Sequence, residues 1–224
     1  MTYSAAPRPV PVWDLPVRLF HWTLAFLVVA AVVTGKLGRL DLHMKLGAAI
    51  LALLLFRLAW GAVGSRTARF SDFVKGPAAI AAFLRETRVG RPVDRVGHNP
   101  LGALSVVALL AVALAQAATG LFTSDDIMTE GPLAWAVSAK TVSLLSTVHR
   151  LGVKALLALI ALHLGAIAFY RLAKGEDLVS PMITGWRPMP TYVPGNSGGH
   201  PAIAALLAAA AAAAVWGVLA VWGR

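Results

Sequence analysis

Two histidines, His149 and His163, lie 14 residues apart in an apolar stretch, 143–171, that is long enough to cross a bilayer. An α-helix advances about 1.5 Å and turns about 100° per residue, so both imidazoles project from nearly the same face, roughly 21 Å apart. Ionisable side chains are costly inside a membrane and indicate a functional site. The spacing therefore predicts one helix that contributes ligands to two sites at different depths.

The composition predicts that this helix belongs to an integral membrane protein. Hydrophobic residues make up 58% of the 224 residues, and the mean hydropathy is +0.73. Apolar runs of about 18 residues or more predict spanning helices, and they occur at 18–35, 43–63, 100–122, 143–171 and 201–222. We expect an all-α membrane fold, in which a four-helix transmembrane bundle occupies 1–187. A linker at 188–200 then leads to a fifth, C-terminal transmembrane helix at 201–222.

Two segments outside these runs also carry structural signals. The first 17 residues contain four prolines, which predicts an irregular segment with Pro16 in the first turn of the following helix. The segment 77–88 has apolar side chains at Ile80, Phe83 and Leu84 and predicts a short helix on the membrane surface. The N-terminus lacks a signal-peptide cleavage pattern, so we expect the first apolar run to be retained as a span.

The charges indicate lipid contact and topology rather than nucleic-acid binding. The net charge is +10, but the lysines and arginines concentrate in particular connections, as lipid headgroups and the positive-inside rule require. The N-terminus and the second and fourth connections carry twice as many as the opposite side. We therefore expect a cytoplasmic N-terminus and an outward-facing acidic loop, 123–142, with Asp125, Asp126 and Glu130. The chain has no cysteine, which excludes disulfides, iron–sulfur clusters and c-type haem attachment.

This topology sorts the histidines of the spans by depth. His43 and His149 fall near the outer side, whereas His21 and His163 fall towards the cytoplasm. Two bis-histidine sites on facing helices suit b-type haem. Tetrahedral zinc needs four ligands at one place, so a zinc or copper site is the weaker alternative. His98 and His200 fit an interfacial role better than ligation.

Small and basic residues accompany these histidines. Gly47, Gly152 and Gly165 would permit close approach of a porphyrin, or would serve plain helix packing. Cations for haem propionates are available on both sides: Arg150, Lys36, Arg39 and Lys45 outside, and Arg18 and Arg57 towards the cytoplasm. Arg57 is informative because it lies 14 residues from His43 on the same helix, although its side chain could instead extend to the membrane surface.

Several motifs in order resemble the bacterial cytochrome b561 family, which includes the b-type cytochrome subunit of nickel–iron hydrogenases. They are VWDLPVRLFHW, RFSDFVKGP, GHNPLG, GLFTSDDIMTEGPLA, VHRLG and LVSPMITG, and they span roughly 12–187. The resemblance implies a four-helix, di-haem, quinone-reactive cytochrome of the bacterial inner membrane. It implies His21, His43, His149 and His163 as haem ligands, and a quinone site near the cytoplasmic haem with His98 and Arg18 as candidates. The segment after His200 departs from the four-helix pattern.

We therefore expect a transmembrane cytochrome with two b-type haems that passes electrons between a redox partner and the quinone pool. The partner would be a c-type cytochrome, or a dehydrogenase or hydrogenase subunit, on the periplasmic side. The acidic loop would dock a basic partner by charge complementarity, or is simply solvated. A superoxide oxidase of the same fold, with a basic funnel near the outer haem, remains open. So does a metal transporter without haem.

Overall fold

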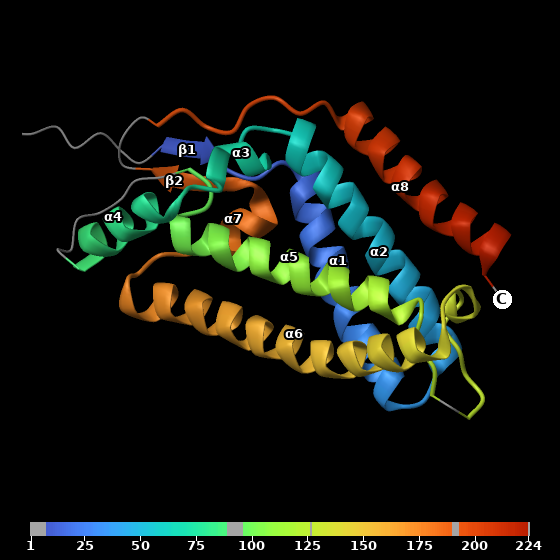
Figure 1. Ribbon diagram of the computed structural model, residues 1–224. Helices are drawn as coiled ribbons and strands as arrows, with labels where there is room; N and C mark the ends of the chain where they lie inside the picture. Colours follow the sequence, from blue (N-terminus) through green and yellow to red (C-terminus); the bar gives the residue numbers. More distant parts are fainter. Residues whose placement is uncertain (1–7, 89–95, 126, 190–192, 224) are drawn as a thin grey trace, which may run out of the picture. The chain divides into compact units, whose positions relative to one another are not determined.

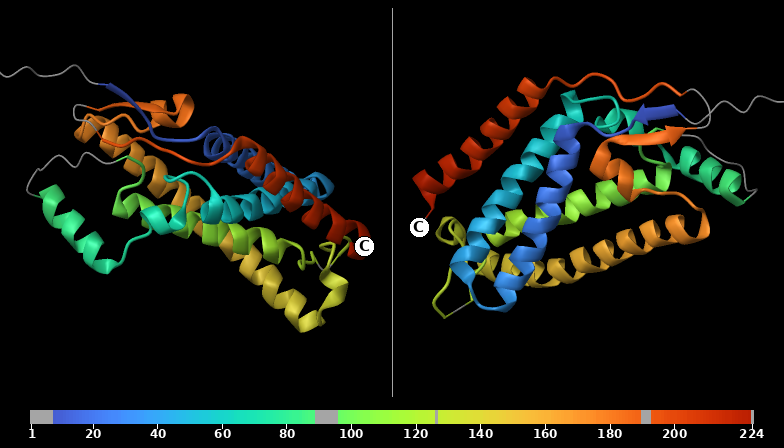
Figure 2. Two further views of the ribbon diagram at one scale, coloured as in Figure 1. Left: turned by 90° about the horizontal axis from the view of Figure 1, so that it is seen from above. Right: turned by 180° about the vertical axis from the view of Figure 1, so that it is seen from behind.

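Five long helices account for most of the chain. The computed structural model describes residues 8–88, 96–125, 127–189 and 193–223. Within these ranges the long helices are α1 (Leu15–Lys36), α2 (Leu40–Val63), α5 (Pro100–Gly120), α6 (Ala139–Ala173) and α8 (Pro201–Trp222) (Figure 1). Each is long and apolar enough to cross a membrane, so the five predicted spans are confirmed. Figure 2 shows α6 as one continuous helix in both views, and it carries both His149 and His163.

Short elements connect the spans. They are β1 (Arg8–Pro11), α3 (Phe70–Phe73), α4 (Pro77–Arg88), the 3-10 turn η1 (Ala134–Ala136), α7 (Val179–Thr184) and β2 (Trp186–Met189). The helix predicted at 77–88 is α4. The prediction of an irregular N-terminus was wrong for β1, which pairs antiparallel with β2. Pro9 lies opposite Pro188, and such a pair fits a position without ladder hydrogen bonds, so neither proline costs the sheet a bond.

The chain divides into two compact units, each of which takes residues from all five long helices. Unit 1 comprises Met1–Leu19, Ala59–Val107 and His163–Ala204. Unit 2 comprises Phe20–Leu58, Ala108–Leu162 and Ala205–Arg224. The predicted division into a 1–187 domain, a linker and a terminal helix stays a prediction.

In unit 1, Asp14 fixes the beginning of α1 to the end of α2. Its Oδ1 accepts a hydrogen bond from the backbone N–H of Val17 at 2.7 Å, which caps a helix that begins three residues earlier than the sequence predicted. Its Oδ2 accepts hydrogen bonds from Trp60 Nε1 at 3.0 Å and from Ser65 Oγ at 2.5 Å. One carboxylate therefore satisfies donors from three parts of the chain.

Asn196 ties the segment before α8 to the same region of unit 1. Its backbone N–H donates to Pro11 O at 2.7 Å. Its side-chain Oδ1 accepts from the N–H of Thr67 at 3.1 Å, and its Nδ2 donates to Ser65 Oγ at 3.1 Å. The segment that leads into α8 is thus fastened to β1 and to the connection after α2 by one amide side chain.

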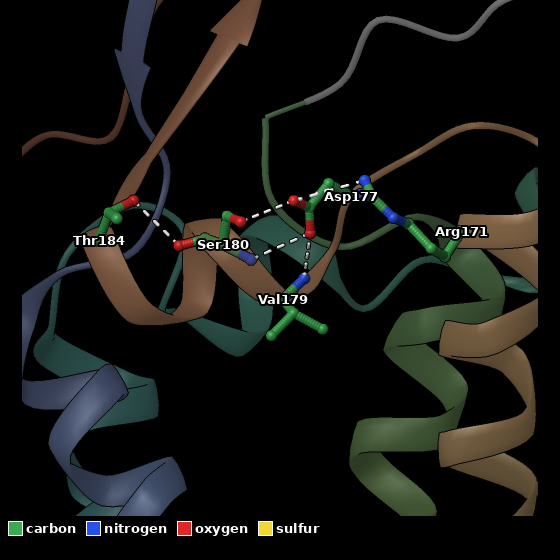
Figure 3. A network of polar contacts seen from close by, with 5 residues as sticks. All are labelled: Arg171, Asp177, Val179, Ser180 and Thr184. Carbon is green, nitrogen blue, oxygen red and sulfur yellow. Dashed lines mark hydrogen bonds and ion pairs between the residues drawn. The ribbon is translucent and has the colours of Figure 1, made fainter.

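Asp177 organises the turn between α6 and α7 (Figure 3). Its Oδ1 accepts the backbone N–H groups of Val179 and Ser180 at 3.0 and 3.1 Å, and its Oδ2 accepts from Ser180 Oγ at 2.6 Å. Arg171, in the last turn of α6, forms an ion pair with it at 3.6 Å. The Ser180 side chain, with these backbone groups and Arg171, lowers the pKa of Asp177, so the turn holds an ionised carboxylate.

In unit 2, α8 packs on α2 through small side chains. Val215 is buried together with Ala48 and Ala52. At the other end of α8, the Trp222 carbonyl accepts a hydrogen bond from Trp135 Nε1 at 2.8 Å, and the two indole rings stack with centroids 6.2 Å apart. The alanine-rich helix is therefore held to α2 by one apolar cluster around Val215 and to the loop before α6 by one tryptophan pair near its end.

Candidate functional site

His43 of α2 and His149 of α6 lie next to each other in unit 2. Their ring centroids are 6.1 Å apart, and the ring planes are nearly perpendicular, at 87°. A metal held between two imidazoles by bonds of about 2 Å would separate the ring centroids by roughly 6 Å. The structure therefore brings together the two residues that the sequence paired by depth, at a separation that suits a shared metal.

Each of the two imidazoles is oriented by a backbone carbonyl of the neighbouring helix. His43 Nδ1 lies 2.8 Å from Ala31 O of α1, and His149 Nδ1 lies 3.0 Å from Gln116 O of α5. A carbonyl oxygen only accepts hydrogen bonds, so Nδ1 must carry the proton in both rings. The lone pair then resides on Nε2 in both, as ligation through that atom requires, and the carbonyl fixes the ring as it does in many metal sites.

Gln116 also approaches the ligating edge of His149. Its side-chain Nε2 lies 3.3 Å from His149 Nε2, and its Oε1 is buried without a hydrogen-bond partner among the described residues. A Cβ atom at Gly152 would overlap this oxygen, so Gly152 makes room for Gln116. Because Nε2 has a single lone pair, an amide N–H and a metal are alternative partners for it. Coordination of a metal by His149 Nε2 therefore requires the Gln116 amide to turn away.

Glycines of two other helices let the backbone approach the imidazoles. A Cβ atom at Gly35 of α1 would lie 3.1 Å from His43 Nδ1, and one at Gly120 of α5 would lie 3.0 Å from His149 Cε1. By contrast, a Cβ atom at Gly47 or Gly165 would meet no atom of the polypeptide within 4 Å. The sequence did not single out Gly35 and Gly120, because periodicity alone does not reveal which neighbouring helix faces a given histidine.

The second predicted pair is divided between the two units. His21, half-buried on α1, belongs to unit 2, and its ring lies edge-on to Trp22 with centroids 4.9 Å apart. His163, half-buried on α6, belongs to unit 1. The pairing of His21 with His163 stays a prediction.

The three arginines proposed for cofactor binding differ in their surroundings. Arg57 is only 3% exposed, so the alternative in which its side chain extends to the membrane surface was wrong. Arg150 is exposed and donates to Thr147 Oγ1, one turn back on α6, at 3.3 Å. Arg18 donates to the carbonyl of Ile183 in α7, so part of its guanidinium is already used to hold α7.

The remaining histidines have structural surroundings. The ring of His98 lies between those of Trp13 and Phe73, with centroid distances of 4.6 Å to each. His200 Nδ1 accepts a hydrogen bond from the N–H of Ala202 at 3.2 Å, in the first turn of α8. Among the described residues, His, Asp and Glu side chains form no group of three or more that could hold a metal ion. A metal site built from protein ligands alone is therefore not seen in this part of the chain.

The acidic loop after α5 is internally organised. Asp125 Oδ1 accepts backbone N–H groups of Ile127, Met128 and Thr129 at 3.0, 2.9 and 2.8 Å. These bonds, that from Thr129 most of all, lower the pKa of Asp125 to about 2. Asp125 is therefore ionised, and its carboxylate is tied to the backbone of its own loop. Asp126, the second acid of this prediction, lies outside the described residues.

Comparison with known proteins agrees with the motif pattern. Residues 12–185 match the family model of prokaryotic cytochrome b561. Among similar proteins, the probable Ni/Fe-hydrogenase B-type cytochrome subunit of Azotobacter chroococcum mcd 1 is 26% identical over 211 residues, covering 80% of this chain and 88% of the relative. The protein of the same name from Rhizobium leguminosarum bv. viciae is 25% identical over 215 residues, with 80% and 89% covered.

The match covers four of the five spans and includes all four histidines predicted as ligands; α8 lies beyond it. With most of the chain matched and five helices able to cross a membrane, this protein belongs to the prokaryotic cytochrome b561 family and is a multi-pass membrane cytochrome of the b type.

Proposed function

We propose that the protein carries two b-type haems and conducts electrons across the bilayer between a redox-enzyme partner and the quinone pool. The single observation that carries this proposal is the His43–His149 pair, with centroids 6.1 Å apart and both Nδ1 atoms at backbone carbonyls. A haem iron bound between two such imidazoles would accept and release single electrons without an open position for oxygen.

The residues of the chain would divide the work of holding the cofactors. His43 and His149 would ligate one haem, with their rings oriented by Ala31 O and Gln116 O. His21 and His163 would ligate the other. Arg57, a cation of α2 that is 3% exposed, is the residue that we propose beside a haem propionate.

The partners and the membrane follow from the relatives and from the charge distribution. Relatives from several bacteria are named as hydrogenase subunits, which supports a dehydrogenase or hydrogenase as electron donor or acceptor. A c-type cytochrome is the alternative partner on the periplasmic side. The positive-inside rule supports a cytoplasmic N-terminus in the bacterial inner membrane. Quinone would react near the haem of His21 and His163.

An optical spectrum of the purified protein tests the proposal. We expect a reduced-minus-oxidised difference spectrum with a b-type α-band, and a haem assay that gives two haems per chain. Chemical removal of the haem should abolish the band, and added haem should restore it. A purified, folded chain without an α-band would refute the cytochrome assignment, and one haem per chain would refute the second site.

The glycines beside the imidazoles provide a sharper prediction. Gly35→Ala and Gly120→Ala each place a methyl group about 3 Å from a ligand ring, and crowding of this kind costs about 1–3 kcal/mol. We expect both variants to bind less haem at the His43–His149 site. Gly217→Ala in α8, where a Cβ atom meets nothing within 4 Å, is the matched control and should keep the full haem content. Equal haem content in all three variants would contradict the close approach of Gly35 and Gly120 to the imidazoles.

A superoxide oxidase remains the second candidate because four cations of unit 2 are exposed close in sequence to His43 or His149. They are Lys36, Arg39, Lys45 and Arg150. In that reaction two superoxide ions would be oxidised to two molecules of oxygen, and their two electrons, together with two protons, would reduce one quinone to the quinol. Reduction of the haem by a superoxide source, weakened by charge-neutralising variants of these residues, would favour it. Reduction only by a hydrogenase or a c-type cytochrome would exclude it.

A further inference from the structure

Unit 1 contains a cavity beyond the ends of two spanning helices. Its volume is about 260 Å³. Its walls come from the connection after α2, from α3 and the residues that follow it, from the segment before α5, and from 193–194. The side chains used below are Arg66, Asp72, Phe73, Lys75 and His98. None of these residues belongs to the proposed haem sites.

Arg66 is held in the cavity wall with unused donor capacity. Its Nη2 donates to Gly195 O at 2.9 Å and also to Pro194 O, and its backbone N–H donates to Ser197 O at 2.9 Å. These contacts fix the guanidinium in place. Its Nε is buried and has no hydrogen-bond partner among the described residues. Because Nε is shielded from solvent, a ligand in the cavity would meet the accessible nitrogens of the guanidinium, whose N–H donors favour a group that accepts hydrogen bonds.

The charges of the wall favour a monoanion. Lys75 supplies a second cation, whose Nζ contacts only Ser71 O, at 3.2 Å, among the described residues. Asp72 offsets one of the two positive charges. A single net positive charge suits a phosphodiester, which carries one negative charge, and an arginine presents the planar donors that phosphate oxygens accept. The rings of Phe73 and His98, with centroids 4.6 Å apart, form a rigid aromatic wall beside these cations.

The place of the cavity in the fold identifies the source of the phosphate. α2 ends at Val63 and α5 begins at Pro100, so the cavity lies where the chain leaves the apolar spans. Exposed apolar side chains occur nearby in the sequence, at Val74 and Leu101, and α4 carries apolar and basic faces beside Lys75. Basic pockets at the ends of spanning helices are where anionic headgroups bind. We propose that this cavity binds the phosphodiester of an anionic phospholipid, with Arg66 and Lys75 as the phosphate contacts.

Lipid exchange on the full-length, haem-loaded protein tests this site. The protein is placed in vesicles of phosphatidylcholine with or without phosphatidylglycerol, and bound lipid is counted by native mass spectrometry after extraction. We expect the wild type to retain phosphatidylglycerol in preference to phosphatidylcholine. Arg66→Gln should lower that retention about tenfold, the equivalent of one charge-assisted contact. Lys75→Gln should lower it about threefold, because its ammonium is exposed and screened.

The control is Arg85→Gln, an exposed cation of α4 that does not line the cavity, and it should retain lipid as the wild type does. Lys75→Gln keeps the test decisive if Arg66→Gln fails to fold, since Lys75 makes only one exposed contact. Equal retention in Lys75→Gln and Arg85→Gln would overturn the proposal. So would displacement of the lipid by millimolar inorganic phosphate, which would indicate a free-anion site, or by a short-chain quinone, which would indicate a quinone site.

Discussion

Replacing His43 with alanine should remove one haem, and replacing His149 should remove the same haem. The two rings face each other at 6.1 Å from α2 and α6, so either substitution leaves the iron with one protein ligand. No other side chain can take over as ligand, because the described His, Asp and Glu residues form no group of three at this site. Each single variant should therefore retain half the haem of the wild type, together with the spectrum and midpoint potential of the haem that remains.

The double variant tests whether His43 and His149 hold the same haem or two different haems. His43→Ala combined with His149→Ala should lose no more haem than either single variant, because both act on one site. His98→Ala and His200→Ala are matched controls, since these rings pack against aromatic residues or cap α8, and both should keep two haems. A double variant without any haem would show that the two histidines serve different haems.

The sequence was sufficient for the spans and for the contact of one histidine pair. Hydropathy located all five long helices, because a bilayer demands about 20 apolar residues from each. Counting basic residues assigned depth, and depth placed His43 with His149. Only depth was needed there, because both histidines lie in the N-terminal half of their helices. The contact between the rings then required only that α2 and α6 be neighbours.

Other features could not be read from periodicity. The carbonyls that orient the imidazoles, Ala31 O and Gln116 O, belong to the backbone, and backbone groups leave no mark in the sequence. The strand at Arg8–Pro11 was missed because it pairs with a distant strand, Trp186–Met189, and a long-range pairing carries no local signal. Arg57 was equally consistent with a buried or an extended side chain until its 3% exposure was known.

Removing the Asp14 carboxylate should lower the stability of the folded protein more than the other substitutions proposed outside the haem sites. Asp14→Ala deprives Trp60 Nε1 and Ser65 Oγ of their acceptor, and both residues are fully buried, at 0% exposure. Each buried donor left without an acceptor costs about 1–3 kcal/mol. The cap on the N–H of Val17 is lost as well, which adds about 1 kcal/mol. At the lower end of these ranges we expect a total loss of about 3 kcal/mol, measured as a lower midpoint of thermal unfolding in detergent.

Asp14→Asn distinguishes the cap from the buried bonds. An asparagine keeps one oxygen for the N–H of Val17, but its amide nitrogen cannot accept from Trp60 or Ser65. It should therefore recover the cap alone and remain about 2 kcal/mol less stable than the wild type. Asp41→Asn, a substitution of an exposed acid in the first turn of α2, should change the midpoint little.

Because Asp14 fastens α1 to the end of α2 in unit 1 and contacts neither His43 nor His149, the α-band of the folded variants should keep its position. If Asp14→Asn unfolded at the wild-type temperature, the hydrogen bonds of Trp60 and Ser65 to this carboxylate would contribute nothing to the fold, and the beginning of α1 would be held by the Val17 cap and apolar packing.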